Sequence, residues 1–323
     1  MSMADEMPPG SEGPTLRARV TPLAITRALL LALAFALAVY LLVAEWEGIT
    51  DALRRIGGSA ATLAAILTAL GIWTSAVAWR WSVQALGPTI PHREARRVFF
   101  VTQLGKYLPG GIWGIVGQID AASRLGAGRS RVAVGASVFL VLHVLTGLLV
   151  AALALPWRSQ ALLEHYAWSL LLAIPLLILM APPVLARLAR LAQRVLRRPM
   201  TEVRLDPSCL AASAAWFLTT WAFYGVALAV LAARLAQPVP MVQLLVLTTG
   251  GFALAWVIGA LVLPAPSGIG PREVVLYFAL LPVMDPAAAT AVTIACRAMH
   301  VAGDVALGVA HVHGYKMTHG GSA

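Results

Sequence analysis

Seven long apolar stretches alternate with shorter polar connections along this 323-residue chain. A helix of about 20 apolar residues crosses the hydrocarbon core of a bilayer. Because the apolar runs are continuous and do not alternate with polar positions, they favour membrane helices over the strands of a barrel. The pattern predicts spans over residues 28–44, 60–79, 132–155, 168–186, 209–233, 240–263 and 287–310.

Two segments between these spans carry Pro and Gly where an apolar helix would otherwise continue. Residues 105–118 read GKYLPGGIWGIVGQ, and residues 263–273 read LPAPSGIGPRE. Pro removes a backbone donor and Gly weakens a helix. At membrane depth such backbone persists only where protein or a water-filled cavity satisfies its polar groups. Paired interruptions in the two halves of a membrane protein point to a substrate site.

The pieces around each interruption are too short to cross a bilayer. In the first segment we expect a helix up to Tyr107, a break at 108–111 and a short piece over 112–119. In the second we expect a break at 264–271 and a short piece over 272–281. Since none reaches about 20 residues, re-entrant hairpins are favoured over spans.

The composition places the chain in the class of integral membrane proteins. Apolar residues make up 59% of the chain, charged residues 12%, and the mean hydropathy is +0.80. A soluble domain carries about 25% charged residues. We therefore predict an all-α fold, a polytopic helical membrane bundle of about seven to eight spans with two Gly/Pro-broken re-entrant segments.

The net charge of +10 raises the question of nucleic acid, but the position of the charges points to a membrane. On the predicted spans, 18 of the 24 Lys and Arg fall on one side, five on the other, and Arg297 within a span. This is the positive-inside pattern. It predicts a multi-pass protein of the inner (plasma) membrane with a cytoplasmic N-terminus, whose partners are membrane lipids and not nucleic acid. In the loop 187–208, Arg190, Arg194 and Arg198 share a helix face. These arginines either anchor the topology at the inner leaflet or form a specific lipid site.

The two interrupted segments also align as an internal repeat. Residues 109–112 (PGGI) match residues 266–269 (PSGI) at an offset of 157, and the same offset places His143 on His300. Counting the predicted spans puts both breaks on the cytoplasmic side, which makes the halves parallel. One span more or fewer would invert them.

The last predicted span carries Arg297, His300 and Asp304 at i, i+3 and i+7, on one helix face. An Arg at the centre of a membrane helix costs roughly 2.5–3.5 kcal/mol on insertion scales, so this face should point into the bundle. Two interpretations remain. Asp304 bridges Arg297 and fixes helix packing, or it holds the guanidinium in an anion site for a phosphate headgroup, whose oxygens suit the planar fork of Arg.

Arg272 and Glu273 open the short helix after the second break. Exposed N–H groups at a helix start attract anions, and an acid in the first turn complements the helix dipole. Arg272 is therefore either a phosphate clamp or an interfacial residue that snorkels to the cytoplasmic surface. The break itself adds Pro266, Gly268 and Gly270 to the candidate site.

The first break gathers a second set of candidate residues. Lys offers a point charge for phosphate, and Tyr and Trp commonly lie at headgroup level. The alternative is simple interfacial anchoring. The candidates are Lys106, Tyr107, Pro109, Gly110, Gly111, Trp113, Gln118 and Arg124.

No motif for a cofactor, metal or nucleotide stands out. Cys209 and Cys296 have no metal-ligand spacing, and the C-terminal histidines have no acidic or Cys partner at a suitable distance along the chain. His143 is either a hydrogen-bonded interhelical partner or a proton relay. The sequence has no hydrolase or NTPase motif, and we expect no enzymatic activity, no cofactor and no metal.

These motifs, in this order, resemble the flippase-like integral membrane family named after the transmembrane region of lysylphosphatidylglycerol synthase. The resemblance covers about residues 28–312 and rests on residues 105–113, residues 266–273 and Arg297. It implies a helical bundle with re-entrant elements that binds or moves lipids. In the full synthases a separate soluble domain transfers an aminoacyl group from tRNA to phosphatidylglycerol. The non-membrane stretches here are too short for such a domain, so that activity is not carried over.

The domain prediction is a disordered cytoplasmic tail over 1–27, a helical membrane domain over 28–316 and a tail over 317–323. The predicted halves are 60–186 and 209–310.

The functional hypothesis is a protein that binds a phosphate-bearing lipid and moves it between leaflets. The lipid is an anionic phospholipid or a polyprenyl-phosphate-linked glycan. Lys106, Arg272 and Arg297 would neutralise the headgroup, and Asp304 and Glu273 would orient the cations. Two alternatives remain: a membrane-embedded transferase with Asp304 or Glu273 as an essential acid, and a non-transporting partner of cell-envelope enzymes.

Overall fold

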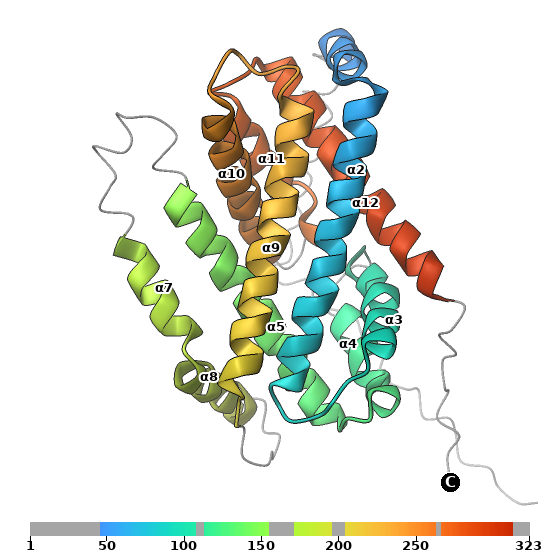
Figure 1. Ribbon diagram of the computed structural model, residues 1–323, viewed down its shortest axis with the longest axis vertical. Helices are drawn as coiled ribbons and strands as arrows, with labels where there is room; N and C mark the ends of the chain where they lie inside the picture. Colours follow the sequence, from blue (N-terminus) through green and yellow to red (C-terminus); the bar gives the residue numbers. More distant parts are fainter. Residues whose placement is uncertain (1–45, 108–112, 155–170, 196–203, 263–265, 313–323) are drawn as a thin grey trace, which may run out of the picture.

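The computed structural model describes residues 46–107, 113–154, 171–195, 204–262 and 266–312. Within these ranges the chain forms α-helices and short 3-10 turns (Figure 1). In chain order they are α2 (Trp46–Gln84), α3 (His92–Gln103), η1 (Leu104–Tyr107), α4 (Trp113–Asp120), η2 (Ala122–Leu125), α5 (Arg129–Ala154), α7 (Ala173–Met180), α8 (Pro182–Val195), α9 (Pro207–Ala232), α10 (Met241–Leu261), η5 (Pro266–Gly268), α11 (Pro271–Leu280) and α12 (Pro286–Val312).

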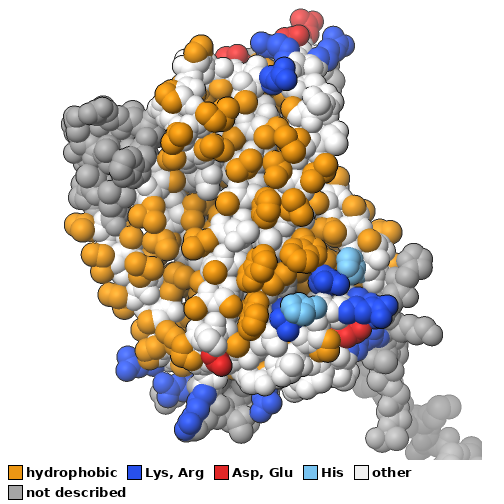
Figure 2. All heavy atoms as spheres, in the orientation of Figure 1, with side chains coloured by type: hydrophobic (Ala, Val, Ile, Leu, Met, Phe, Trp, Pro, Cys, Tyr) orange, Lys and Arg blue, Asp and Glu red, His pale blue; other side chains and the backbone are white. Residues whose placement is uncertain are grey.

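Five of these helices are long and apolar enough to cross a membrane. Figure 2 shows hydrophobic side chains over the middle of one face and charged side chains toward its two ends. The predicted all-α membrane bundle is confirmed, and five of the seven predicted spans have a matching helix. The prediction over 28–44 lies outside the described residues. The five matching segments are Thr50–Gln84, Arg129–Ala154, Pro207–Ala232, Met241–Leu261 and Pro286–Val312.

Local chemistry explains where two of the long helices begin. At α9, the Asp206 side chain accepts from the backbone N–H of Ser208 at 2.7 Å, with Pro207 as the first helical residue. At α12, the Asp285 side chain accepts from the N–H of Ala288 at 2.8 Å. Both arrangements satisfy backbone donors that a helix start leaves without a partner.

The predicted span over 168–186 is not one continuous helix. α7 ends at Met180 and α8 begins at Pro182, because Ala181 between them is extended (φ −61°, ψ 136°). A residue before Pro is biased toward this conformation. On α8, Leu185 is buried and Arg190 is exposed, while Arg194 and Arg198 lie outside the described side chains.

Two antiparallel helices, α2 and α9, lie side by side along the bundle (Figure 1). The hydroxyls of Thr74 and Thr220 lie 2.8 Å apart, and so do those of Ser82 and Ser213. Residue numbers thus rise along α2 as they fall along α9. Polar pairs of this kind join membrane helices, where apolar burial alone gives little drive to associate.

The second broken segment forms a hairpin of α10 and α11. A side chain at Gly251 would meet Ala279, and one at Gly259 would meet Arg272, so the two helices run antiparallel at close range. The N–H of Gln237, between α9 and α10, donates to the carbonyl of Val283 at 2.7 Å. α11 therefore returns to the end of the bundle from which α10 starts.

The first broken segment forms a hairpin that enters from the opposite end. A side chain at Gly105 would meet Trp113 and Gly114, and one at Gly117 would meet Thr102, which sets α4 back along the end of α3. α3 follows the end of α2, whereas α10 follows the end of α9. Since α2 and α9 are antiparallel, the hairpins approach each other from opposite ends, and η1 contacts η5 where they meet.

The elements α2–α5 correspond to α9–α12 as an inverted repeat. α5 begins at Arg129 and α12 at Pro286, the same 157 residues apart as the matched prolines of the two breaks. The expectation that both breaks lie on one side, with parallel halves, is wrong, because α11 reverses the chain once more than the span count allowed. Arg272, counted on the cytoplasmic side, lies inside the bundle and is 8% exposed.

The inverted arrangement predicts which loops share a side of the membrane. In a background carrying Cys209→Ser and Cys296→Ala, we expect Arg234→Cys and Pro282→Cys to react with an impermeant thiol reagent from one side of sealed vesicles. Ser130→Cys should react from the other side, because α5 starts at the opposite end of the bundle. Labelling of the first two positions from different sides would contradict the arrangement.

Candidate functional site

The two hairpins enclose a cavity of about 210 Å³ where their tips meet. Its walls come from both hairpins, from α2 and α9, and from the matched helices α5 and α12. The structure brings together seven of the predicted site residues along this cavity: Lys106, Tyr107, Gln118, Gly268, Arg272, His300 and Asp304.

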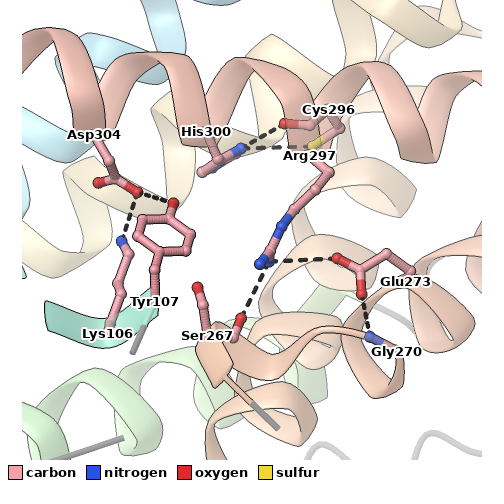
Figure 3. Close-up of polar contacts among 9 residues, drawn as sticks. All are labelled: Lys106, Tyr107, Ser267, Gly270, Glu273, Cys296, Arg297, His300 and Asp304. Atoms are coloured by element: carbon pink, nitrogen blue, oxygen red, sulfur yellow. Dashed lines mark hydrogen bonds and ion pairs between the residues drawn. The ribbon is translucent and has the colours of Figure 1, made fainter. Parts of the chain in front are cut away.

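The buried carboxylate of Asp304 joins α12 to the first hairpin (Figure 3). Its Oδ2 accepts from the hydroxyl of Tyr107 at 2.6 Å and lies 2.7 Å from Nζ of Lys106. Burial, and then the nearby carboxylate, raise the pKa of Tyr107, so its hydroxyl stays protonated and donates. Oδ1 of Asp304 is buried without a hydrogen-bond partner. One carboxylate oxygen thus holds two groups of the hairpin, and the other remains available.

Arg297 joins the same helix to the second hairpin. Its Nη1 donates to the carbonyl of Ser267 at 3.1 Å and lies 3.4 Å from Oε1 of Glu273. The other carboxylate oxygen of Glu273 accepts from the N–H of Gly270 at 2.7 Å, at the start of α11. The prediction that Arg297 lies inside the bundle is confirmed, since its side chain is 16% exposed. The predicted pairing of Arg297 with Asp304 is wrong, because each residue pairs with a different hairpin.

Arg272 is the most buried cation of the cavity. It is 8% exposed, its Nη2 is buried without a hydrogen-bond partner, and its guanidinium lies 4.8 Å from the ring centroid of Phe252. Interaction with the ring face offsets part of the cost of removing the charge from water. This burial contradicts the alternative of a snorkelling interfacial residue.

Glycine lets the backbone bring Arg272 this close to the cavity. Gly268 has φ +71°, a conformation that glycine adopts without strain. A side chain at Gly268 would meet the backbone of Gly259 at 2.8 Å, and one at Gly259 would meet Cβ of Arg272 at 2.9 Å. The break therefore packs directly on α10.

Two histidines line the cavity from matched helices of the repeat. Nδ1 of His300 lies 2.9 Å from the carbonyl of Cys296 and must donate to it, because a carbonyl only accepts. Nε2 of His300 is buried and without a partner. Both nitrogens of His143 are also without partners, and its ring centroid lies 3.7 Å from that of Trp256. The expectation of a hydrogen-bonded interhelical partner is wrong for His143, which packs by ring contacts.

The other predicted residues surround the cavity or lie away from it. Trp113 opens α4 and is 49% exposed, and Arg124 belongs to η2. Pro266 begins η5, and Gly270 precedes α11. Pro109, Gly110 and Gly111 lie outside the described residues.

Sequence reasoning missed several lining residues because their types are common in membrane helices. Only His143 carried a signal, its alignment with His300 in the repeat. The cavity also includes Ser75, Gln103, Tyr224 and Trp256. In the described part of the chain no group of three His, Cys, Asp or Glu is placed to hold a metal ion.

Replacing Glu273 tests the connection between α12 and the second hairpin. Glu273→Ala removes both the cap on the Gly270 N–H and the partner of Arg297, and we expect it to lower the free energy of unfolding by about 1–2 kcal/mol. Glu273→Gln keeps an acceptor for the cap and should be intermediate in thermal unfolding. Glu94 is the matched control: it holds the third position of α3 and pairs with Arg97 at 2.7 Å, but Pro91 before that helix has no N–H to bind. An equal loss for Glu94→Ala would contradict the assignment.

Most of the chain matches one known protein family. No curated protein matches it significantly. Residues 28–308 match the family described as the lysylphosphatidylglycerol synthase TM region. The matched residues include both hairpins and nearly all of α12. The chain therefore belongs to the lysylphosphatidylglycerol synthase transmembrane-region family.

Proposed function

We propose that this protein binds the phosphate of a lipid headgroup in the cavity between its hairpins and moves that lipid between the leaflets of the inner membrane. The observation that carries the proposal is Arg272, a cation 8% exposed with Nη2 unpartnered, on the wall of the cavity. A buried charge without a counter-ion is costly. A bound phosphate would supply the missing partner, and its oxygens fit the guanidinium fork.

Neighbouring groups support an anionic headgroup. Lys106 lines the same cavity and adds a second cation to it. Asp304 and Glu273, the carboxylates that a transferase would need as free acids, both pair with cations. Their contacts favour a role as counter-ions that hold Lys106 and Arg297 in place.

The surroundings of the cavity support a lipid over a water-soluble anion. Leu140 lines the cavity and is 40% exposed, within an exposed stripe of α5 that includes Ser137 and Val141. The cavity thus adjoins a surface that would face acyl chains. Trp256 and Phe139 add apolar walls. A headgroup could lie inside while its chains remain in the bilayer.

The inverted hairpins support movement across the membrane. In membrane transporters, inverted halves rock around a site near the midplane, where broken helices meet. Here two re-entrant hairpins would enter from opposite leaflets, with the arginine-rich end cytoplasmic. The lipid would be an anionic phospholipid or a polyprenyl-phosphate-linked glycan, and passage would be passive, ion-coupled or driven by an envelope-biosynthesis partner.

Removing the Arg272 charge tests the proposal. We expect Arg272→Gln at equal folded yield to lose the anionic lipid that the wild type retains after mild purification, as measured by mass spectrometry. It should also slow translocation of that lipid in proteoliposomes at least about tenfold, since a charge-assisted contact contributes about 1.5–3 kcal/mol.

Arg55→Gln is the matched control, because Arg55 is an exposed arginine that pairs with Asp51 on the surface. An unchanged lipid profile and rate in Arg272→Gln would leave Arg272 as a packing residue. That result would favour the alternative of a non-transporting partner of cell-envelope enzymes.

A further inference from the structure

The charged side chains of the cavity have one positive charge in excess. Lys106 and Arg272 line it, and Asp304 is the one charged acid among the described lining residues. The adjoining pair of Arg297 and Glu273 is neutral as a unit.

No other described residue near the cavity changes this count. The residues that interrupt the two hairpins, 108–112 and 263–265, contain no charged side chain. No acid is paired with His143 or His300 in the described part of the chain, so neither ring has a counter-ion to support a charge.

Asp304 already supplies the negative charge that balances Lys106. Its Oδ2 lies 2.7 Å from Nζ of Lys106 and accepts a hydrogen bond of 2.6 Å from the Tyr107 hydroxyl. Its side chain is 2% exposed, so water screens it little. A ligand in the cavity meets the negative charge of Asp304 on one side and the guanidinium of Arg272, whose Nη2 has no hydrogen-bond partner, on the other.

We propose that the cavity accepts a headgroup with one singly charged phosphodiester, and that Asp304 sets this limit by disfavouring doubly charged phosphate monoesters and diphosphates. This inference rests on the proposed function and narrows its substrate. A single phosphodiester charge balances the excess, whereas a second charge would stay uncompensated beside a buried carboxylate. Phospholipids with diester headgroups and sugars linked through one polyprenyl phosphate satisfy the limit. Diphosphate-linked carriers do not.

The test compares two soluble lipids with the same chains. Dihexanoyl phosphatidylglycerol carries one diester charge, and dihexanoyl phosphatidic acid is a monoester that carries nearly two charges at pH 8, since its second pKa is about 6 to 7. We expect delipidated wild-type protein to bind the diester at least about tenfold more tightly in calorimetric titration. Asp304→Asn should remove or reverse that preference, a change of at least about tenfold in the ratio of dissociation constants.

Two further variants separate charge from structure. Lys106→Gln/Asp304→Asn removes the pair together and keeps the excess of one positive charge, so it should show the wild-type ratio. Asp120→Asn makes the same charge change at an exposed acid of α4, paired with Arg129 outside the cavity, and should leave the ratio unchanged. If Asp304→Asn does not fold, the double variant still tests the charge balance: a preference for the monoester there would overturn the inference.

The possible failures are distinguishable. If the wild type binds neither lipid, the proposed phosphate site itself is wrong. If it binds both equally and Asp304→Asn leaves the ratio unchanged, the phosphate site stands and the charge limit is wrong.

Discussion

The contact between Lys106 and Asp304 is the interaction on which the arrangement of the site depends. It joins the tip of the first hairpin to α12, while Arg297 on the same helix holds the second hairpin through Glu273 and the carbonyl of Ser267 (Figure 3). One helix therefore fixes both broken segments, each through an ion pair whose members come from different elements. Breaking either pair would leave a poorly solvated charge, which costs more than an ordinary lost hydrogen bond.

The ion pairs have this role because the rest of the bundle gives them a rigid frame. α2 and α9 approach closely at Gly71, where any side chain would meet the ring of Tyr224. α9 and α10 approach closely at Gly225, where a side chain would meet Thr249. Small residues allow such packing in membrane helices, where burial of apolar surface alone does not hold helices together. The hairpins can then carry irregular backbone, since the frame around them is regular.

The spans and the breaks were predictable because apolar length and the backbone chemistry of Pro and Gly are local properties. The interior position of Arg297 was predictable for the same reason, since the cost of a charge in lipid depends on its own helix. The pairings were not. Seven residues rise about 10 Å along a helix, so Asp304 was in fact too far along the axis to be the best partner of Arg297. Its partner came from Lys106, which precedes it by nearly 200 residues and which helix periodicity does not relate to it. The orientation of the halves was missed because α11 is too short to count as a span, although it reverses the chain.

The repeat relates the helices of the two halves, but it does not relate their charged residues. Shifted by the repeat offset of 157 residues, Arg297 falls on Leu140, Asp304 on Gly147 and Arg272 on Ile115. A symmetric frame with unsymmetric charges places one set of cations, Lys106 and Arg272, where the hairpins meet, and not a separate set in each half. Under the proposed function, a headgroup arriving from either leaflet would meet the same cations and the same Asp304. The charge limit would therefore be the same in both directions, whatever supplies the energy.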